Sequence, residues 1–291
     1  MSNDALMIAS AILNLQQESS IFKDFLFPLL SALLSVLAGY YIANKSFKKQ
    51  EKLKTELDRV NSCNVFIVGV DGMLQTLASI KTIYNGKLNS HPVVRAMSIP
   101  KITTYIFPPP DASAIVFLAY ANEYKDDHKF YEGWNNIPRF NAMLGNYAQV
   151  YEVTQRRNNL LESLSKLVTL EGDGTGVINL EEFTDENWRE LRKLADVTET
   201  LISKVDGLIR EVNSCIHNLH LAANKVINND LIKGHASIVT YVNKDDDFKN
   251  LLKPTIEVDY SLLGDLLGIT AEEARSTYKS GYENAPYPES D

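Results

Sequence analysis

Cysteine, excess positive charge and catalytic signature motifs are all scarce in this sequence. Only two cysteines occur, Cys63 and Cys215, and they lie far apart, which excludes a disulfide framework and fits a reducing compartment. The formal net charge is −8, from 29 basic and 37 acidic residues. General nucleic-acid binding, which needs a basic face, is therefore not expected. No P-loop, GxSxG, HExxH or dinucleotide-binding glycine pattern occurs, so no cofactor is expected and an enzyme is the less favoured class.

Charge is also absent from a long apolar run near the N-terminus. Residues 25–44 read FLFPLLSALLSVLAGYYIAN and contain no Asp, Glu, Lys or Arg. A helix of about 20 apolar residues, rising about 1.5 Å per residue, crosses the hydrocarbon core of a bilayer. Pro28 falls in the first turn, where a missing amide donor costs little. The run predicts a single transmembrane helix, in preference to a buried core helix or a signal peptide.

Lysines gather on one side of this run and predict its orientation. Only Lys23 precedes the run, whereas five lysines follow it within ten residues: Lys45, Lys48, Lys49, Lys52 and Lys54. The positive-inside rule then places residues 45–291 in the cytoplasm and the N-terminus outside an inner or plasma membrane. Residues 1–24 form a short outer segment. Its apolar residues between Ala5 and Leu15 have helical spacing, which fits an interfacial helix or a short packing helix.

Helical periodicity also dominates the first half of the remaining sequence. A long helix is predicted from the membrane to about residue 85, and Gly69 and Gly72 indicate a bend or a close contact within it. The proline-rich stretch 86–110 is expected to be an irregular connector. Two further helices are predicted over residues 111–125 and 138–168.

The strongest pattern lies between Leu191 and Val226, where apolar residues recur in alternating steps of three and four. The seam of this helix includes Leu191, Leu194, Leu201, Val205, Leu208, Val212 and Leu219. Further apolar residues, such as Ile202 and Ile209, widen the seam into a two-sided stripe, which is typical of a helical bundle. We therefore predict an all-α fold. One transmembrane helix (25–44) continues into a cytosolic bundle with long antiparallel helices (45–230).

The C-terminal part, residues 231–291, is predicted to be small and irregular. Ser237–Val242 reads SIVTYV, which favours a short strand. Thr270 and Glu273 have the spacing of a capping box at the start of a small helix. The residues after Lys279 are expected to form a loose tail.

The glycine-rich segment 171–182 resembles the calcium loop of an EF-hand. The positions that would bind the ion are Glu171, Asp173, Thr175, Asn179 and Glu182, with Gly176 at the turn position. Calcium takes six or more oxygen ligands, and this spacing brings alternate side chains to one point. The segment departs from the family pattern at positions one and five of the loop, where it has Glu171 and Thr175. A calcium-responsive regulator is therefore one alternative function, beside a simple turn between helices.

Arg210 and His217 form an R-x6-H pair that resembles part of the motif of HEPN ribonucleases. In that family the histidine acts as an acid or base and the arginine stabilises phosphate charge. The resemblance implies a membrane-tethered ribonuclease as a second alternative. His217 and His220, three residues apart, could also share a metal ion if His235 or a carboxylate joined them. Arg156, Arg157, Asn158 and Asn159 predict a solvated helix face.

The favoured function is that of a membrane-anchored interaction protein, a tether, sensor or oligomeric effector that acts through helix assembly. Small residues give the membrane helix a face on which helices can approach closely: Ser31, Ala32, Ser35, Ala38 and Gly39. The expected partners are the lipid bilayer and either a second copy of the chain or another protein. The simple anchor and the absence of processing motifs favour a bacterial origin. Sequence periodicity leaves open whether the long helices pair within one chain or between chains.

Overall fold

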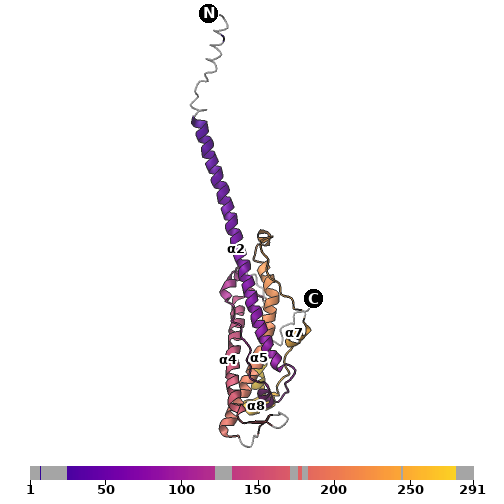
Figure 1. Cartoon of the computed structure of the whole chain (residues 1–291). Helices are drawn as coiled ribbons and strands as arrows, with labels where there is room; N and C mark the ends of the chain where they lie inside the picture. The colour runs from indigo at the N-terminus through magenta and orange to yellow at the C-terminus, as the bar shows by residue number, and fades with distance from the viewer. Residues whose placement is uncertain are drawn as a thin grey trace. The chain divides into compact units, whose positions relative to one another are not determined.

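The computed structural model describes residues 7, 25–121, 133–170, 176–178, 183–243 and 245–279, and these residues are mainly helical (Figure 1). The predicted all-α class, with a long apolar N-terminal helix and a packed helical bundle, is confirmed. The chain divides into two compact units, residues 1–55 and 56–291. Helix α2 (Phe27–Tyr84) begins in the first unit and ends in the second. The helix considered between Ala5 and Leu15 and the tail after residue 279 lie outside the described residues.

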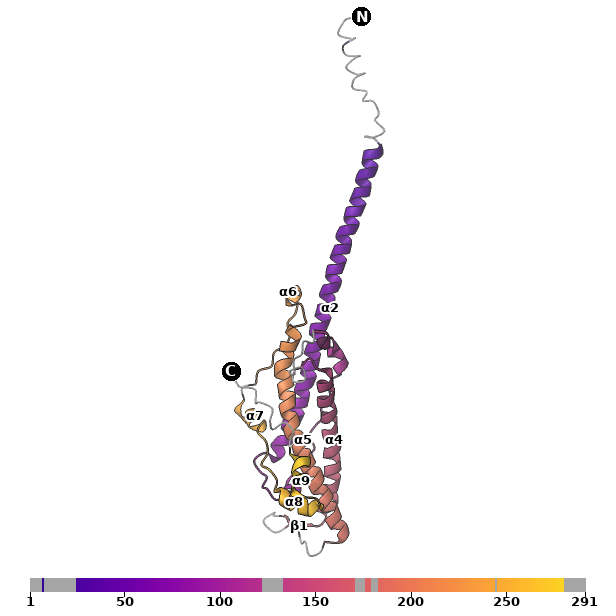
Figure 2. The ribbon, with the colours of Figure 1, turned by 180° about the vertical axis from the view of Figure 1, so that it is seen from behind.

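Three long helical segments build the second unit: residues 56–84 of α2, α4 (Ile137–Ser165) and α5 (Asp185–Asn224). The side chains that join α4 to α5 show that the two helices are antiparallel. Arg139 near the start of α4 contacts Glu211 near the end of α5, whereas Ser163 near the end of α4 contacts Glu190. Both views show the two helices side by side (Figure 1, Figure 2). Phe66 of α2 meets Phe140 of α4 edge to face, with ring centroids 5.5 Å apart.

Helix α5 is the centre of the core, as its heptad pattern indicates. Its N-cap Thr184 accepts a hydrogen bond from the amide of Asn187, which satisfies one of the free donors of the first turn. The seven predicted seam residues are all buried: Leu191, Leu194, Leu201, Val205, Leu208, Val212 and Leu219. They are buried inside a single chain. The seam therefore has no apolar face left for a second copy of the protein.

The proline-rich connector is more ordered than the sequence predicted. Residues 86–110 were expected to be irregular, yet α3 (Pro92–Ser98) lies within them. Pro92 falls at the first helical position, where its fixed φ and missing amide donor favour a helix start. The later prolines 108–110 stay outside helices, as expected. The next segment, η2 (Ala112–Ala121), is a 3₁₀ helix.

Short elements complete the second unit. A two-stranded antiparallel hairpin, β1 (Val168–Leu170) with β2 (Gly176–Ile178), follows α4. After α5 come α6 (Asn229–Ile232), α7 (Asp246–Leu251), α8 (Tyr260–Leu267) and α9 (Ala271–Tyr278). The capping box of Thr270 and Glu273 is confirmed at the start of α9.

The strand predicted at Ser237–Val242 is wrong, because none of these residues belongs to a strand or a helix. Its backbone is bound instead by one side chain of α2. The Asn64 amide donates to the carbonyl of Ser237 (3.0 Å), and its oxygen accepts from the amide of Val239 (2.9 Å). A strand needs a neighbouring ladder of backbone groups, and here the neighbour is a helix.

Gly69 and Gly72 mark a close contact rather than a bend. A β-carbon at Gly72 would lie 2.8 Å from the ring of Phe107, and one at Gly69 would lie 2.7 Å from Pro110. The connector therefore packs directly on the backbone of α2. Beside this contact, Thr76 accepts a hydrogen bond from the amide of Phe107, and Tyr147 of α4 donates to the Phe107 carbonyl.

We expect Gly72→Ala to lower the free energy of unfolding by about 1–3 kcal/mol, because overpacking outweighs the gain of about 1 kcal/mol in helix propensity. Urea titration in mild detergent measures this change. Gly145→Ala is the matched control, since a β-carbon at this glycine of α4 meets no atom within 4 Å. The control is expected to stabilise the protein. If both variants were stabilised equally, the close contact at Gly72 would be contradicted.

Candidate functional site: an exposed apolar helix and a buried ionic clamp

The start of α2, residues 27–44, is apolar and entirely exposed. α2 is the one helix in the described part of the chain that is long and apolar enough to cross a membrane. None of its most apolar window is buried by other parts of the protein, and the side chain of Leu34 is 64% exposed. A core helix of a folded domain would bury such residues. These exposed leucines need an apolar environment that the chain itself does not provide.

The two serine side chains within this apolar stretch are hydrogen-bonded within the helix. The hydroxyl of Ser31 donates to the carbonyl of Pro28 (2.9 Å), and the hydroxyl of Ser35 donates to the carbonyl of Ser31 (2.7 Å). Groups placed in lipid must find partners within the protein, because no water is available there. A β-carbon at Gly39 would meet no atom within 4 Å. The face that contains the small residues predicted for helix association, Ser31, Ala32, Ser35, Ala38 and Gly39, is exposed along its length.

In the second unit, a buried ion pair joins α2 to α5. The ammonium of Lys81 lies 2.8 Å from a carboxylate oxygen of Asp206, and the Lys81 side chain is fully buried. The same two side chains also hold the segment that follows α7. Lys81 donates to the carbonyl of Lys253, while Asp206 accepts from the amide and the hydroxyl of Thr255 at 2.6 and 3.0 Å. Both charges are thereby compensated away from water.

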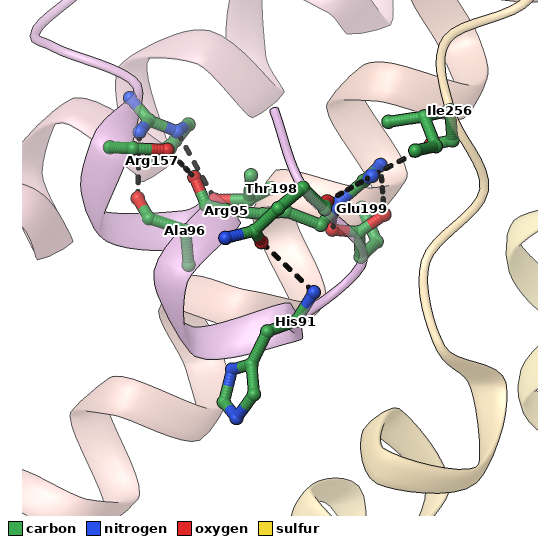
Figure 3. A network of polar contacts seen from close by, with 9 residues as sticks. His91, Arg95, Ala96, Arg157, Thr198, Glu199 and Ile256 are labelled. Carbon is green, nitrogen blue, oxygen red and sulfur yellow. Dashed lines mark hydrogen bonds and ion pairs between the residues drawn. The ribbon is translucent and has the colours of Figure 1, made fainter. Parts of the chain in front are cut away.

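A second buried ion pair lies nearby and joins α3 to α5 (Figure 3). The guanidinium of Arg95 forms a bidentate pair with Glu199, with nitrogen–oxygen distances of 2.8 and 3.1 Å. A further nitrogen of Arg95 donates to the carbonyls of Asn89 and Ile256. Burial raises the pKa of Glu199 above its ordinary value, while the adjacent Arg95 acts in the opposite direction.

These four side chains, Lys81, Asp206, Arg95 and Glu199, form what we call the ionic clamp. All four reach one segment, residues 253–256, either directly or through their partner, and we call this segment the strap. The clamp binds three backbone groups of the strap and the hydroxyl of Thr255. Beyond the strap, the amide of Asp259 donates to Ser90, and Tyr278 of α9 donates to Asp196 of α5. These two bonds hold α8 and α9 against the rest of the second unit, next to the strap that the clamp holds.

Arg157 stands beside the clamp and is fully buried (Figure 3). Its guanidinium donates to the hydroxyl of Thr198 and to the carbonyls of Ala96, Ile99 and Pro100. Burial lowers the pKa of Arg157 to about 10. Asn158 pairs with both backbone groups of Ile102. The predicted solvated face is therefore wrong for these two residues, whereas Arg156 and Asn159 are exposed.

A scan against protein-family models, a search of curated proteins and a search of solved structures each found no match. The residues of this chain therefore carry the functional argument.

The structure places Arg210 and His217 on the same face of α5, two turns apart. Both are half-buried. The His217 ring is fixed by its Nδ1, which lies 2.8 Å from the carbonyl of Asn213, and by an edge-to-face contact with Tyr241. Because a carbonyl oxygen can only accept, Nδ1 is the donor in this contact. These contacts describe a packed histidine.

The calcium ligand positions Glu171, Asp173, Thr175, Asn179 and Glu182 lie outside the described residues. The described part of that segment, Gly176–Ile178, pairs with Val168–Leu170 as a hairpin. In the described ranges no group of three His, Cys, Asp or Glu side chains is placed to hold a metal ion. Cys215 is a buried seam residue, and burial raises the pKa of its thiol.

The clamp was not predicted from the sequence, although the sequence contains a signal for it. Polar residues recur every seven positions along one side of α5, as Glu199, Asp206, Asn213 and His220. They alternate with the apolar residues Ala195, Ile202, Ile209 and Ile216 on the same side. A polar heptad within an apolar stripe indicates buried polar groups that need partners from other helices. Two of these groups, Glu199 and Asp206, form the clamp.

Proposed function

We propose that this protein is a single-pass membrane-anchored helical interaction protein, a tether, sensor or effector that works through helix contacts rather than catalysis. The observation that carries the proposal is the uncharged, fully exposed start of α2, residues 27–44. Its length fits the hydrocarbon core, and its two serine hydroxyls are bonded within the helix. In this proposal the lysine-rich side faces the cytoplasm and the N-terminus lies outside the inner or plasma membrane.

In the mechanism that we infer, the membrane helix anchors the protein and the second unit recognises the partner. The seam of α5 is satisfied inside one chain, so self-association would use the small-residue face of the membrane helix, from Ser31 to Gly39. The second unit offers its outer surface to a protein partner. Partner binding there would change the packing of the membrane helices between discrete arrangements.

We expect Leu33→Asp combined with Leu34→Asp to release the full-length chain from membranes, since each charge at a helix centre costs about 2.5–3.5 kcal/mol of insertion free energy. Extraction of expressing cells with alkaline carbonate measures the fraction that remains in the membrane pellet. The unchanged chain should stay in the pellet and the variant should move to the supernatant.

The matched control replaces Val65 and Val68 with aspartate. These valines are also exposed on α2, at 61% and 66%, but they lie outside the apolar run. The control should remain in the pellet with the unchanged chain. An unchanged chain that carbonate extracts completely would refute the anchor.

A further inference from the structure

We propose that the lysines after the apolar run form a binding surface for anionic lipid headgroups. This inference rests on the proposed membrane anchor and concerns which lipids surround it. The surface consists of Lys45, Lys48, Lys49 and Lys52, which we call the lysine stripe. All four residues are exposed and lie in one uninterrupted stretch of α2.

The positions of the four lysines place them on one side of the helix. Their spacing of i, i+3, i+4 and i+7 is the spacing of a single helical face. Orientation of a membrane helix requires only that positive residues be present near its end, whatever face they occupy. The positive-inside rule therefore does not explain why these four lysines lie on one side of the helix. It also brings like charges together at i and i+4, which is unfavourable in an isolated helix.

The chain does not supply the counter-charge that would relieve this repulsion. None of the four lysines forms an ion pair with a carboxylate in the part of the chain that the structure describes. The one acidic residue within the stretch is Glu51, which follows Lys48 by three residues but forms no ion pair with the stripe in the residues that the structure describes. A partner with several negative charges would therefore be bound more favourably than solvent ions.

The distance from the apolar run identifies this partner as lipid. Lys45 follows the run directly, and Lys52 lies seven residues further, or about 10 Å along the helix. This span is close to the Debye length of about 8 Å at physiological ionic strength, so the whole stripe lies within the electrostatic field of an anionic membrane surface. Long lysine side chains also reach back to headgroups from such positions.

The test uses the full-length chain reconstituted in phosphatidylcholine bilayers that contain a minor amount of phosphatidylglycerol. Electron paramagnetic resonance of spin-labelled lipids measures how strongly each lipid is retained beside the protein. We expect spin-labelled phosphatidylglycerol to be retained about fivefold more strongly than phosphatidylcholine, as one lysine–headgroup contact would give. High salt should reduce this preference, because the Debye length shortens.

The control variant keeps the composition and the net charge but spreads the lysines around the helix. It exchanges neighbouring residues, as Lys45→Ser with Ser46→Lys and Lys49→Gln with Gln50→Lys. The preference for phosphatidylglycerol should fall to about twofold or less. An equal preference in both proteins would overturn the stripe, because charge alone would then explain the result.

Flotation of the same vesicles separates the two proposals. A chain that floats with the vesicles but shows no lipid preference overturns the lysine stripe and leaves the anchor intact. A chain that does not float with any vesicle overturns the anchor, and the stripe with it. Binding of an RNA or DNA oligonucleotide by the detergent-solubilised chain, lost in the exchanged variant, would also overturn the assignment to lipid.

Discussion

Asp206→Ala is expected to lower the free energy of unfolding by about 3–5 kcal/mol, the usual cost of leaving a buried charge without its partner. The ammonium of Lys81 is fully buried and has Asp206 as its counter-charge at 2.8 Å. The same substitution removes the acceptor of the Thr255 amide and hydroxyl. The strap should therefore loosen as well, and urea titration in mild detergent measures the total loss.

Two companion variants separate the buried pair from ion pairs in general. Glu162→Ala breaks the Lys101–Glu162 pair, which has the same 2.8 Å distance but whose side chains are 55% and 63% exposed. Its cost should stay below about 1 kcal/mol, since water screens exposed pairs. Lys81→Met combined with Asp206→Leu removes both buried charges and should recover the part of the loss that comes from the unpaired ammonium, but not the part that comes from the lost bonds to the strap.

Hydrogen exchange supplies a local readout of the same prediction. In Asp206→Ala the amide of Thr255 should exchange much faster, while the seam of α5 keeps its protection if the fold survives. Should Asp206→Ala cost no more than Glu162→Ala, with unchanged exchange at Thr255, the clamp would not hold the strap.

The elements that the sequence predicted well are those with a local signal. Helix α5 follows from steps of three and four residues between Leu191 and Val226, and the capping box of α9 follows from a Thr and a Glu three residues apart. Both features depend on residues that are close together in the sequence. The sequence could not say that the seam is filled within one chain, because that depends on where α2, α3 and α4 pack.

The ionic clamp depends on contacts that no local pattern contains. Lys81 and Asp206 lie on different helices, and their common ligand, the strap, comes from a third segment. Charge by itself predicts exposure, because most charged side chains are solvated. Periodicity was the better guide for α4, since Arg157 lies seven residues after the buried Val150 and seven before the buried Leu164. Its neighbour Arg156 is one position around the helix and is exposed.

Arg156 and Arg157 are the same residue type in adjacent positions, but one is exposed and the other is buried. Replacing each in turn therefore measures how burial changes the stability that an arginine contributes. Arg157→Ala should lower the free energy of unfolding by about 3–5 kcal/mol, because the buried carbonyls of Ala96 and Ile99 and the Thr198 hydroxyl lose their donor and a cavity remains. Arg156→Ala should change it by less than about 0.5 kcal/mol, as is usual for a surface substitution. Urea titration of both variants measures the difference.

Arg157→Lys tests whether the charge or the planar fork of donors is needed. A lysine keeps the positive charge but has three donors on one nitrogen, and these cannot reach groups spread around a guanidinium. We therefore expect a loss between those of the other two variants, on the order of 1–3 kcal/mol. A lysine variant as stable as the unchanged chain would mean that charge alone is required at this position. Equal stability of Arg157→Ala and Arg156→Ala would show instead that the network around α3 does not stabilise the bundle.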